Sequence, residues 1–105
     1  MNILFDQGVP RPLRGYLGGS KVDTAYEKGW SSLENGDLLT RAEQAGYNLL
    51  VTTDQNLRYQ QNLADRSIAI LVLTSTSWPR IKLKVDKIQQ VVDAFEIGSY
   101  QEIIV

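Results

Sequence analysis

Two short apolar runs in this chain each lead to an aspartate. Residues 3–5 precede Asp6, and residues 48–53 precede Asp54. A segment with helical spacing follows each run, so we expect both aspartates where a strand gives way to a helix. Parallel strands of an open α/β sheet open at their carboxyl ends into one crevice, which is the usual ligand site of such a sheet. Two carboxylates in that crevice predict a binding site for a hard divalent cation.

The residue types that the chain lacks narrow the chemistry further. The 105-residue sequence contains no histidine and no cysteine, which excludes imidazole catalysis, thiolate metal sites and disulfides. Catalysis would then depend on carboxylates, hydroxyls, amines or a bound metal. The formal net charge of −1 argues against the strongly basic surface of a stable nucleic-acid binder, but not against an enzyme that contacts a phosphodiester through a cation.

Hydrophobic spacing along the chain predicts strands that alternate with helices. Strands are expected at residues 1–6, 21–26, 48–53, 67–74 and 100–105, and helices at residues 10–17, 36–45, 54–62 and around 81–95. This alternation predicts a single α/β domain over residues 1–105, with three α/β/α layers and a mainly parallel sheet of four or five strands. Nothing reads as a secretory signal or as the roughly 20 apolar residues of a membrane span, so we expect a cytoplasmic protein.

Each aspartate has a second explanation as a helix N-cap, worth about 1 kcal/mol. Two converging carboxylates repel each other unless a cation or a proton separates them, and near neutral pH we favour a cation. Asp37 is the candidate for a third ligand, although the positive end of a helix dipole also explains an acid in a first helical turn. Further acids near the predicted crevice are Glu27, Glu34 and Asp65, the last of which is more typical of a plain turn.

Neutral and basic side chains near the same crevice are candidates for substrate contact. Thr52 and Asn56 flank Asp54 and can orient its carboxylate by hydrogen bonding, although a threonine also favours strands for its shape alone. Arginines on helices that begin at the crevice can receive a phosphate, and these are Arg11, Arg14 and Arg58. A basic run further along is interpreted as solvated surface, and it consists of Arg80, Lys82, Lys84 and Lys87.

The motif residues resemble those of a known family. The chain is similar to a small PIN-like domain at Ile3-Leu4-Phe5-Asp6-Gln7 with Pro10, at Gly29-Trp30, at residues 35–39, and at Leu50-Val51-Thr52-Thr53-Asp54-Gln55-Asn56-Leu57. The stretch Tyr59-Gln60-Gln61-Asn62-Leu63 resembles a short bacterial branch of that superfamily. The resemblance implies an α/β/α nuclease-like fold in which clustered carboxylates hold Mg²⁺ or Mn²⁺ and direct water onto a phosphodiester of RNA. Many such proteins are toxins that an antitoxin protein restrains. RNA and an antitoxin are then the expected partners, and a homodimer is considered as well.

On this resemblance the first family acid is Asp6 and the strand-end acid is Asp54. Relatives often carry an acid at the start of the middle helix, where this chain has Asn35, and the nearest acid is Asp37. The expected catalytic and metal-binding residues are therefore Asp6, Asp37 and Asp54, a set that suits one ion better than two. The expected activity is that of a metal-dependent endoribonuclease.

Two other functions stay open. A PIN-like module without catalysis could bind only a protein, and Asn35 in place of an acid favours that alternative. A phospho-acceptor receiver domain also places aspartates at strand ends around Mg²⁺. It needs a second acid where Gln7 follows Asp6, and it needs a lysine at the end of the fifth strand, which residues 100–105 do not contain.

Overall fold

In the computed structural model, which describes residues 1–57 and 66–105, five strands form one sheet in which every neighbouring pair is parallel. The strands are β1 (Asn2–Phe5), β2 (Lys21–Thr24), β3 (Leu49–Thr52), β4 (Ala69–Leu73) and β5 (Tyr100–Ile103). Their order across the sheet is β2-β1-β3-β4-β5. The prediction of an α/β protein with a mainly parallel sheet of four or five strands is therefore confirmed.

The strand order creates a switch point between β1 and β3. From β1 the chain first adds β2 on one side and then returns to add β3 on the other. Neighbouring crossovers that run in opposite directions leave a crevice at the carboxyl ends of the two strands, where ligands of open α/β sheets usually bind. Asp6 directly follows β1 and Asp54 lies two residues after β3, so both predicted site residues lie at this point.

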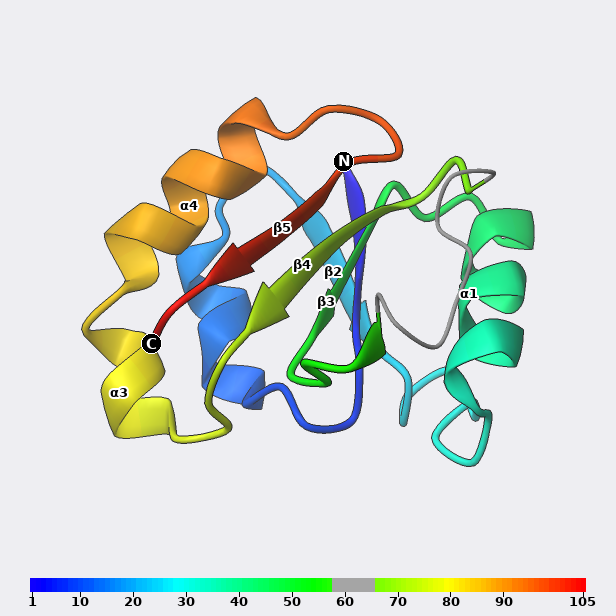
Figure 1. Cartoon of the computed structure of the whole chain (residues 1–105), viewed down its shortest axis with the longest axis horizontal. Helices are drawn as coiled ribbons and strands as arrows, with labels where there is room; N and C mark the ends of the chain where they lie inside the picture. Colours follow the sequence, from blue (N-terminus) through cyan, green and yellow to red (C-terminus); the bar gives the residue numbers. More distant parts are fainter. Residues whose placement is uncertain (58–65) are drawn as a thin grey trace.

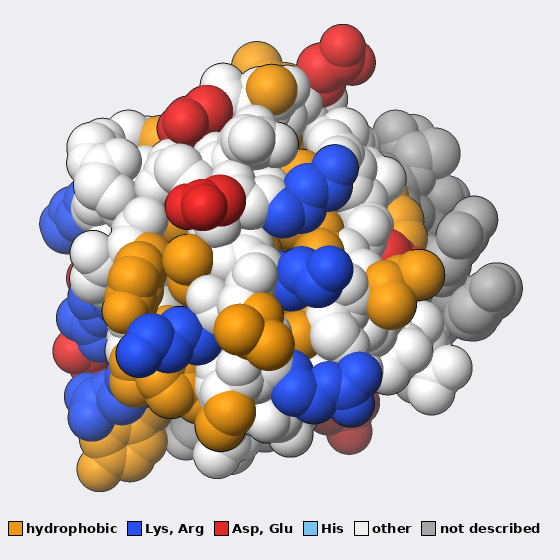
Figure 2. Space-filling model, turned by 90° about the vertical axis from the view of Figure 1, so that its left-hand side faces the viewer, with side chains coloured by type: hydrophobic (Ala, Val, Ile, Leu, Met, Phe, Trp, Pro, Cys, Tyr) orange, Lys and Arg blue, Asp and Glu red, His pale blue; other side chains and the backbone are white. Residues whose placement is uncertain are grey.

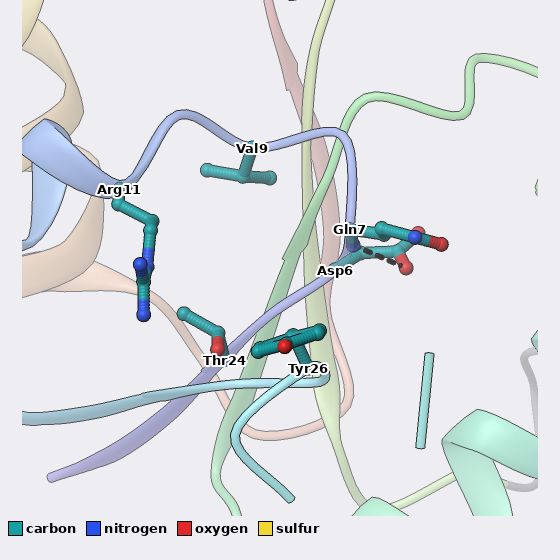
Figure 3. A pocket seen from close by; sticks show the side chains of 6 residues that line it. All are labelled: Asp6, Gln7, Val9, Arg11, Thr24 and Tyr26. Atoms are coloured by element: carbon teal, nitrogen blue, oxygen red, sulfur yellow. Dashed lines mark hydrogen bonds between the residues drawn. The ribbon is translucent and has the colours of Figure 1, made fainter. Parts of the chain in front are cut away.

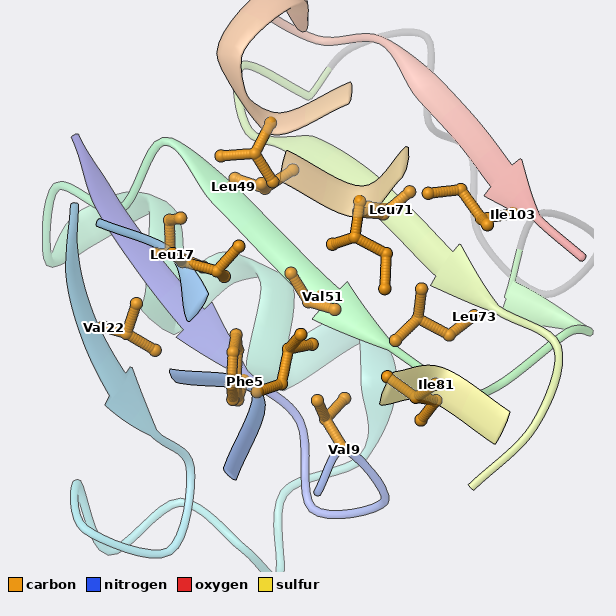
Figure 4. Close-up of a cluster of buried hydrophobic side chains, with 14 of the residues drawn as sticks. Phe5, Val9, Leu17, Val22, Leu49, Val51, Leu71, Leu73, Ile81 and Ile103 are labelled. Atoms are coloured by element: carbon orange, nitrogen blue, oxygen red, sulfur yellow. The ribbon is translucent and has the colours of Figure 1, made fainter. Parts of the chain in front are cut away.

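Burial along the strands explains their sequences. Every residue of β3 and β4 is buried, as expected for central parallel strands covered on both faces. Successive side chains alternate between two apolar clusters: Ile3 and Phe5 belong to one, and Leu4 belongs to the other. Figure 4 shows the first cluster around Phe5 and Val51.

Four helices accompany the sheet within the described part of the chain: the 3₁₀-helix η1 (Arg11–Tyr16), α1 (Asn35–Gln44), α3 (Trp78–Lys82) and α4 (Val85–Ala94). Figure 1 shows α1 on one side of the sheet and α3 and α4 on the other. Leu38 and Leu39 of α1 belong to the same apolar cluster as Leu4, and Ile88 of α4 belongs to the same cluster as Phe5. No helix among residues 1–57 and 66–105 is long and apolar enough to cross a membrane.

Three predicted helices differ from the observed ones. The segment expected at 10–17 forms only a 3₁₀-helix, which begins after Pro10. The segment expected around 81–95 is divided at Leu83 and Lys84, so that two shorter helices of different direction both bury an isoleucine, Ile81 and Ile88. The helix expected at 36–45 begins one residue earlier, because Glu34 is the N-cap residue and Asn35 is the first residue of α1. The helix predicted at 54–62 lies largely outside the described residues.

The basic run predicted as solvated surface is exposed on the α3–α4 side. Its four members, Arg80, Lys82, Lys84 and Lys87, are all exposed, as is Leu83 between them. Figure 2 shows basic side chains interspersed with apolar ones on this face. The Arg80 guanidinium also donates to the Val105 carbonyl oxygen at 2.6 Å, which ties α3 to the residues that follow β5.

Candidate functional site

The sheet itself fixes the position of Asp6. The register of β1 with β3 pairs Leu4 with Leu50 and Phe5 with Val51, so its extension by one residue places Asp6 opposite Thr52. The Asp6 N–H continues the ladder by donating to the Val51 carbonyl oxygen at 2.9 Å. Because side chains two residues apart share a face of a strand, Asp6 and Thr52 follow Leu4 and Leu50 on the α1 side of the sheet.

Thr52 connects the two aspartates. Its hydroxyl donates to Asp6 Oδ2 at 2.8 Å and accepts the backbone N–H of Asp54 at 3.1 Å. Thr52 is only 1% exposed. Its side chain therefore supports the two aspartates from the interior of the protein and is not accessible to a ligand. We predicted Thr52 as a substrate contact and as a residue that orients Asp54; in the structure it orients the carboxylate of Asp6.

Asp54 joins the end of β3 to the start of α1. Its Oδ2 accepts a hydrogen bond from the Asn35 side-chain amide, and its Oδ1 accepts the backbone N–H of Asn56 at 2.9 Å. Asn56 therefore orients Asp54 as predicted, but through its backbone and not its side chain. We use the name aspartate site for Asp6, Asp54, Thr52 and Asn35, which come from the ends of two strands and the first residue of one helix.

Hydrogen bonds from the described residues use only part of the accepting capacity of the carboxylate oxygens of Asp6 and Asp54. Asp6 Oδ1 accepts the Gln7 N–H at 2.8 Å, so from residues 1–57 and 66–105 each of the four oxygens of Asp6 and Asp54 accepts one hydrogen bond. An ionised carboxylate has about four lone-pair positions. These bonds orient both groups and by themselves use only part of the accepting capacity of each oxygen.

The helix-cap explanation does not fit Asp6, and the helix that Asp54 was predicted to cap lies largely outside the described residues. Asp6 bonds the N–H of the next residue, and η1 begins only at Arg11, after Pro10. Asp54 accepts the N–H two residues ahead, which is the local bond of an Asx turn. The local backbone therefore accounts for part of the role of Asp54, whereas Asp6 is explained by its bond across the sheet to Thr52.

No third acid among residues 1–57 and 66–105 joins Asp6 and Asp54 in a metal-binding cluster. Asp37 is exposed in the first turn of α1, and residues 1–57 and 66–105 hold no cluster of three or more acidic, histidine or cysteine side chains that could hold a metal ion. The structure therefore does not assemble the predicted set of Asp6, Asp37 and Asp54. Asp65 and Arg58, two further candidates, lie outside the described residues.

Glu27 serves as the partner of arginine and backbone groups beside the site. Its Oε1 accepts the Thr24 N–H at 2.9 Å and its N–H donates to the Thr24 hydroxyl at 3.1 Å, a reciprocal pair of the capping-box type. Arg14 binds both carboxylate oxygens, at 3.0 and 3.3 Å. The Thr24 hydrogen bond first, and then the Arg14 guanidinium, outweigh desolvation and hold the pKa of Glu27 below its ordinary value.

The two described arginines with predicted phosphate roles differ in their surroundings. Arg14 is committed to this bidentate pair with Glu27, so a phosphate at Arg14 would have to compete with a carboxylate. The Arg11 guanidinium lies 3.8 Å from Glu27, and its side chain is 66% exposed. Arg11 is therefore the better placed of the two to meet a ligand.

Sequence reasoning missed Asn35 as a member of the site. The residue stands where the family resemblance places an acid, and its side-chain amide donates to Asp54 instead of offering another carboxylate. Its position at the start of the middle helix was the available signal, but only the packing of α1 shows which aspartate it meets. No model of a known protein family, no curated protein and no solved structure matches this chain. The PIN-like assignment therefore stays a prediction carried by the motif residues.

Proposed function

We propose that this chain is a three-layer α/β/α, PIN-like domain that cleaves RNA as a metal-dependent endoribonuclease. The observation that carries the proposal is the Thr52 hydroxyl, which connects Asp6 to Asp54 at the switch point of a parallel sheet. Two oriented carboxylates at that edge, in a chain without histidine or cysteine, support metal-assisted hydrolysis over nucleophilic or imidazole chemistry.

The donor set fits one hard cation. Mg²⁺ is commonly held by one or two carboxylates together with waters and substrate phosphate oxygens, and Asp6 and Asp54 offer two carboxylates with lone pairs to spare. A second ion would need more acids than the described residues bring together. When bound, Mg²⁺ or Mn²⁺ supplies a water of lowered pKa and neutralises charge on the attacked phosphate.

The residues of the aspartate site have two roles: some would bind the cation, and others orient the binding carboxylates. Asp6 and Asp54 hold the cation, and Thr52 fixes the rotamer of Asp6 through its hydroxyl. Asn35 fixes Asp54 through its amide and carries no charge, so the site keeps a formal charge of −2 before a cation enters. Such preorganisation matters because a site must hold its geometry closely for catalysis. The toxin role and an antitoxin partner rest on the resemblance alone.

The test compares the native protein with Asp6→Asn and Asp54→Asn. A cation that binds only the folded state adds about 2.7 kcal/mol at a concentration 100 times its dissociation constant. We expect Mn²⁺ to raise the melting temperature of the native protein by about 11–22 °C and to leave both variants unchanged. Asp86→Asn, an exposed acid at the start of α4, is the matched control and should respond like the native protein.

Cleavage of single-stranded RNA is the second part of the same test. We expect slow cleavage with Mg²⁺ or Mn²⁺ that a chelator stops, and loss of cleavage in Asp6→Asn prepared in parallel. Equal cleavage by the two preparations would identify a contaminating nuclease and refute the proposal. Asp37→Asn should have a smaller effect than either change in the aspartate site, because Asp37 lies exposed on α1.

A non-catalytic, protein-binding PIN-like module is the second candidate. The specific observation in its favour is the Asn35 amide bonded to Asp54 at the place where relatives carry an acid. An absence of any Mn²⁺ or Mg²⁺ effect on stability, together with no cleavage by the native protein, would support this module over the nuclease.

A further inference from the structure

A pocket opens beside the aspartate site at the carboxyl ends of β1 and β2. Its volume is about 220 Å³, and it is lined by Asp6, Gln7, Val9, Arg11, Thr24 and Tyr26. Figure 3 shows Val9 and Tyr26 on opposite sides of the hollow, with Arg11 and Thr24 at one end and Asp6 and Gln7 at the other. Because Asp6 lines the pocket and also belongs to the aspartate site, a ligand in the pocket lies next to the proposed reaction centre.

The walls of the pocket suit a flat ring. Val9 is buried and contributes an apolar wall, whereas Tyr26 is 73% exposed and keeps most of its ring surface open to solvent. Aromatic side chains exposed beside a groove are the usual platforms on which unpaired nucleobases stack. Gln7 is exposed at the end of the pocket near Asp6, and its amide can donate to or accept from the edge of a base.

The Arg11 end of the pocket suits a phosphate. The Arg11 guanidinium lies 3.8 Å from the Glu27 carboxylate, whereas the Arg14 guanidinium binds the same carboxylate at 3.0 Å. Arg14 therefore makes the closer, bidentate contact with Glu27, and the largely exposed Arg11 retains N–H donors for an incoming oxyanion. Guanidinium groups recognise phosphate through paired, charge-assisted hydrogen bonds.

We propose that this pocket binds one unpaired nucleobase of the RNA strand, stacked on Tyr26, with the adjoining phosphate on Arg11; the proposal rests on the proposed nuclease function. Such a subsite holds the strand so that the next phosphodiester lies at Asp6. It also restricts the substrate to single strands, because a base stacked in a duplex cannot enter. Stacking accepts every base, so we expect little sequence preference at this position.

Binding is measured without metal, so that it does not depend on cleavage. The probe is a fluorescein-labelled oligouridylate hexamer in low-salt buffer with EDTA, and the signal is fluorescence anisotropy. Stacking on an aromatic side chain changes affinity about tenfold when the ring is removed. We expect Tyr26→Ala to raise the dissociation constant about tenfold and Tyr26→Phe, which keeps the ring, to change it less than twofold.

Two matched controls separate the pocket from the general surface. Leu83→Ala removes another exposed side chain on the α3–α4 side and should leave binding unchanged. Arg11→Ala should weaken hexamer binding and lower the slope of the logarithm of the binding constant against the logarithm of the salt concentration by about 1. Arg41→Ala, at the end of α1, should have a smaller effect on both quantities. A hexamer of ribose phosphates without bases should bind the native protein and Tyr26→Ala equally.

The outcomes distinguish this proposal from the nuclease proposal. Unchanged hexamer binding in Tyr26→Ala, or equal binding of the strands with and without bases, would overturn the base pocket even if Asp6 and Asp54 prove essential for cleavage. A Tyr26-dependent loss of hexamer binding in a protein that cleaves no RNA would retain the base pocket and refute the nuclease. Melting curves of all variants confirm that each is folded.

Discussion

Replacement of Thr52 by valine keeps the shape of the side chain and removes the hydroxyl that connects Asp6 to Asp54. A hydrogen bond to a charged group contributes about 1.5–3 kcal/mol, and a backbone N–H left without its acceptor adds to the loss. Asp6 is half-buried, so water replaces part of the lost bond and the lower end of the range applies. The extra buried methyl group of valine returns about 0.8 kcal/mol. We expect Thr52→Val to lower the free energy of unfolding by about 2 kcal/mol.

The assay is thermal and urea unfolding in metal-free buffer, followed by circular dichroism. In a domain of this size 1 kcal/mol corresponds to about 4–8 °C, so the melting temperature should fall by about 10 °C. Thr52→Ser keeps the hydroxyl and should cost only the lost methyl group, about 1 kcal/mol. Because Asp6 also loses its orientation, the affinity of Thr52→Val for Mn²⁺ should fall relative to the native protein.

A double-mutant cycle assigns the effect to the bond between Thr52 and Asp6. In an Asp6→Ala background the carboxylate is absent, and Thr52→Val should cost at least 1 kcal/mol less than in the native background. An equal cost in both backgrounds would refute the reasoning, because the hydroxyl would then stabilise the fold without involving Asp6. A loss in Thr52→Ser as large as that in Thr52→Val would refute it as well.

Three further predictions follow from other contacts. Asn35→Asp replaces the hydrogen-bond donor to Asp54 with a like charge, so the free energy of unfolding in EDTA should fall by about 1–3 kcal/mol. Calorimetry should show tighter Mn²⁺ binding to this variant, and a variant with unchanged stability and unchanged Mn²⁺ affinity would contradict the proposed site. Gly8→Ala places a Cβ against Thr53 Oγ1 and should lower the free energy of unfolding in urea by about 1–3 kcal/mol. This loss should largely disappear in a Thr53→Ala background; a loss of the same size there would show that the clash with Thr53 is not its cause. Burial raises the pKa of the Tyr47 hydroxyl, so its contribution to stability is complete below about pH 10, the ordinary tyrosine value, and is lost as the pH rises further. Tyr47→Phe should therefore lose less stability than the native protein between neutral and alkaline pH, and parallel losses would show that another group titrates.

Local patterns were sufficient for most of the elements. The apolar runs of β3 and β4 are typical of central strands in a parallel sheet. The apolar spacing in the middle of the chain identifies α1, and Gly46, with a positive φ of 86°, follows the Ala45 C-cap of that helix. The same spacing did not reveal the division between α3 and α4. Ile81 and Ile88 are buried in either arrangement, and the exposed Leu83 becomes distinguishable only when the path of the chain is known.

By itself the sequence determined that Asp6 and Asp54 follow strands, because strand formation depends on the order of apolar residues along a few positions. Tertiary structure alone decided which groups meet them. Thr52 reaches Asp6 across 46 positions because β1 and β3 are neighbours in the sheet, and Asn35 reaches Asp54 because α1 packs over the same edge. Strand order and helix packing arise from contacts between distant segments, and no local pattern along the chain encodes them.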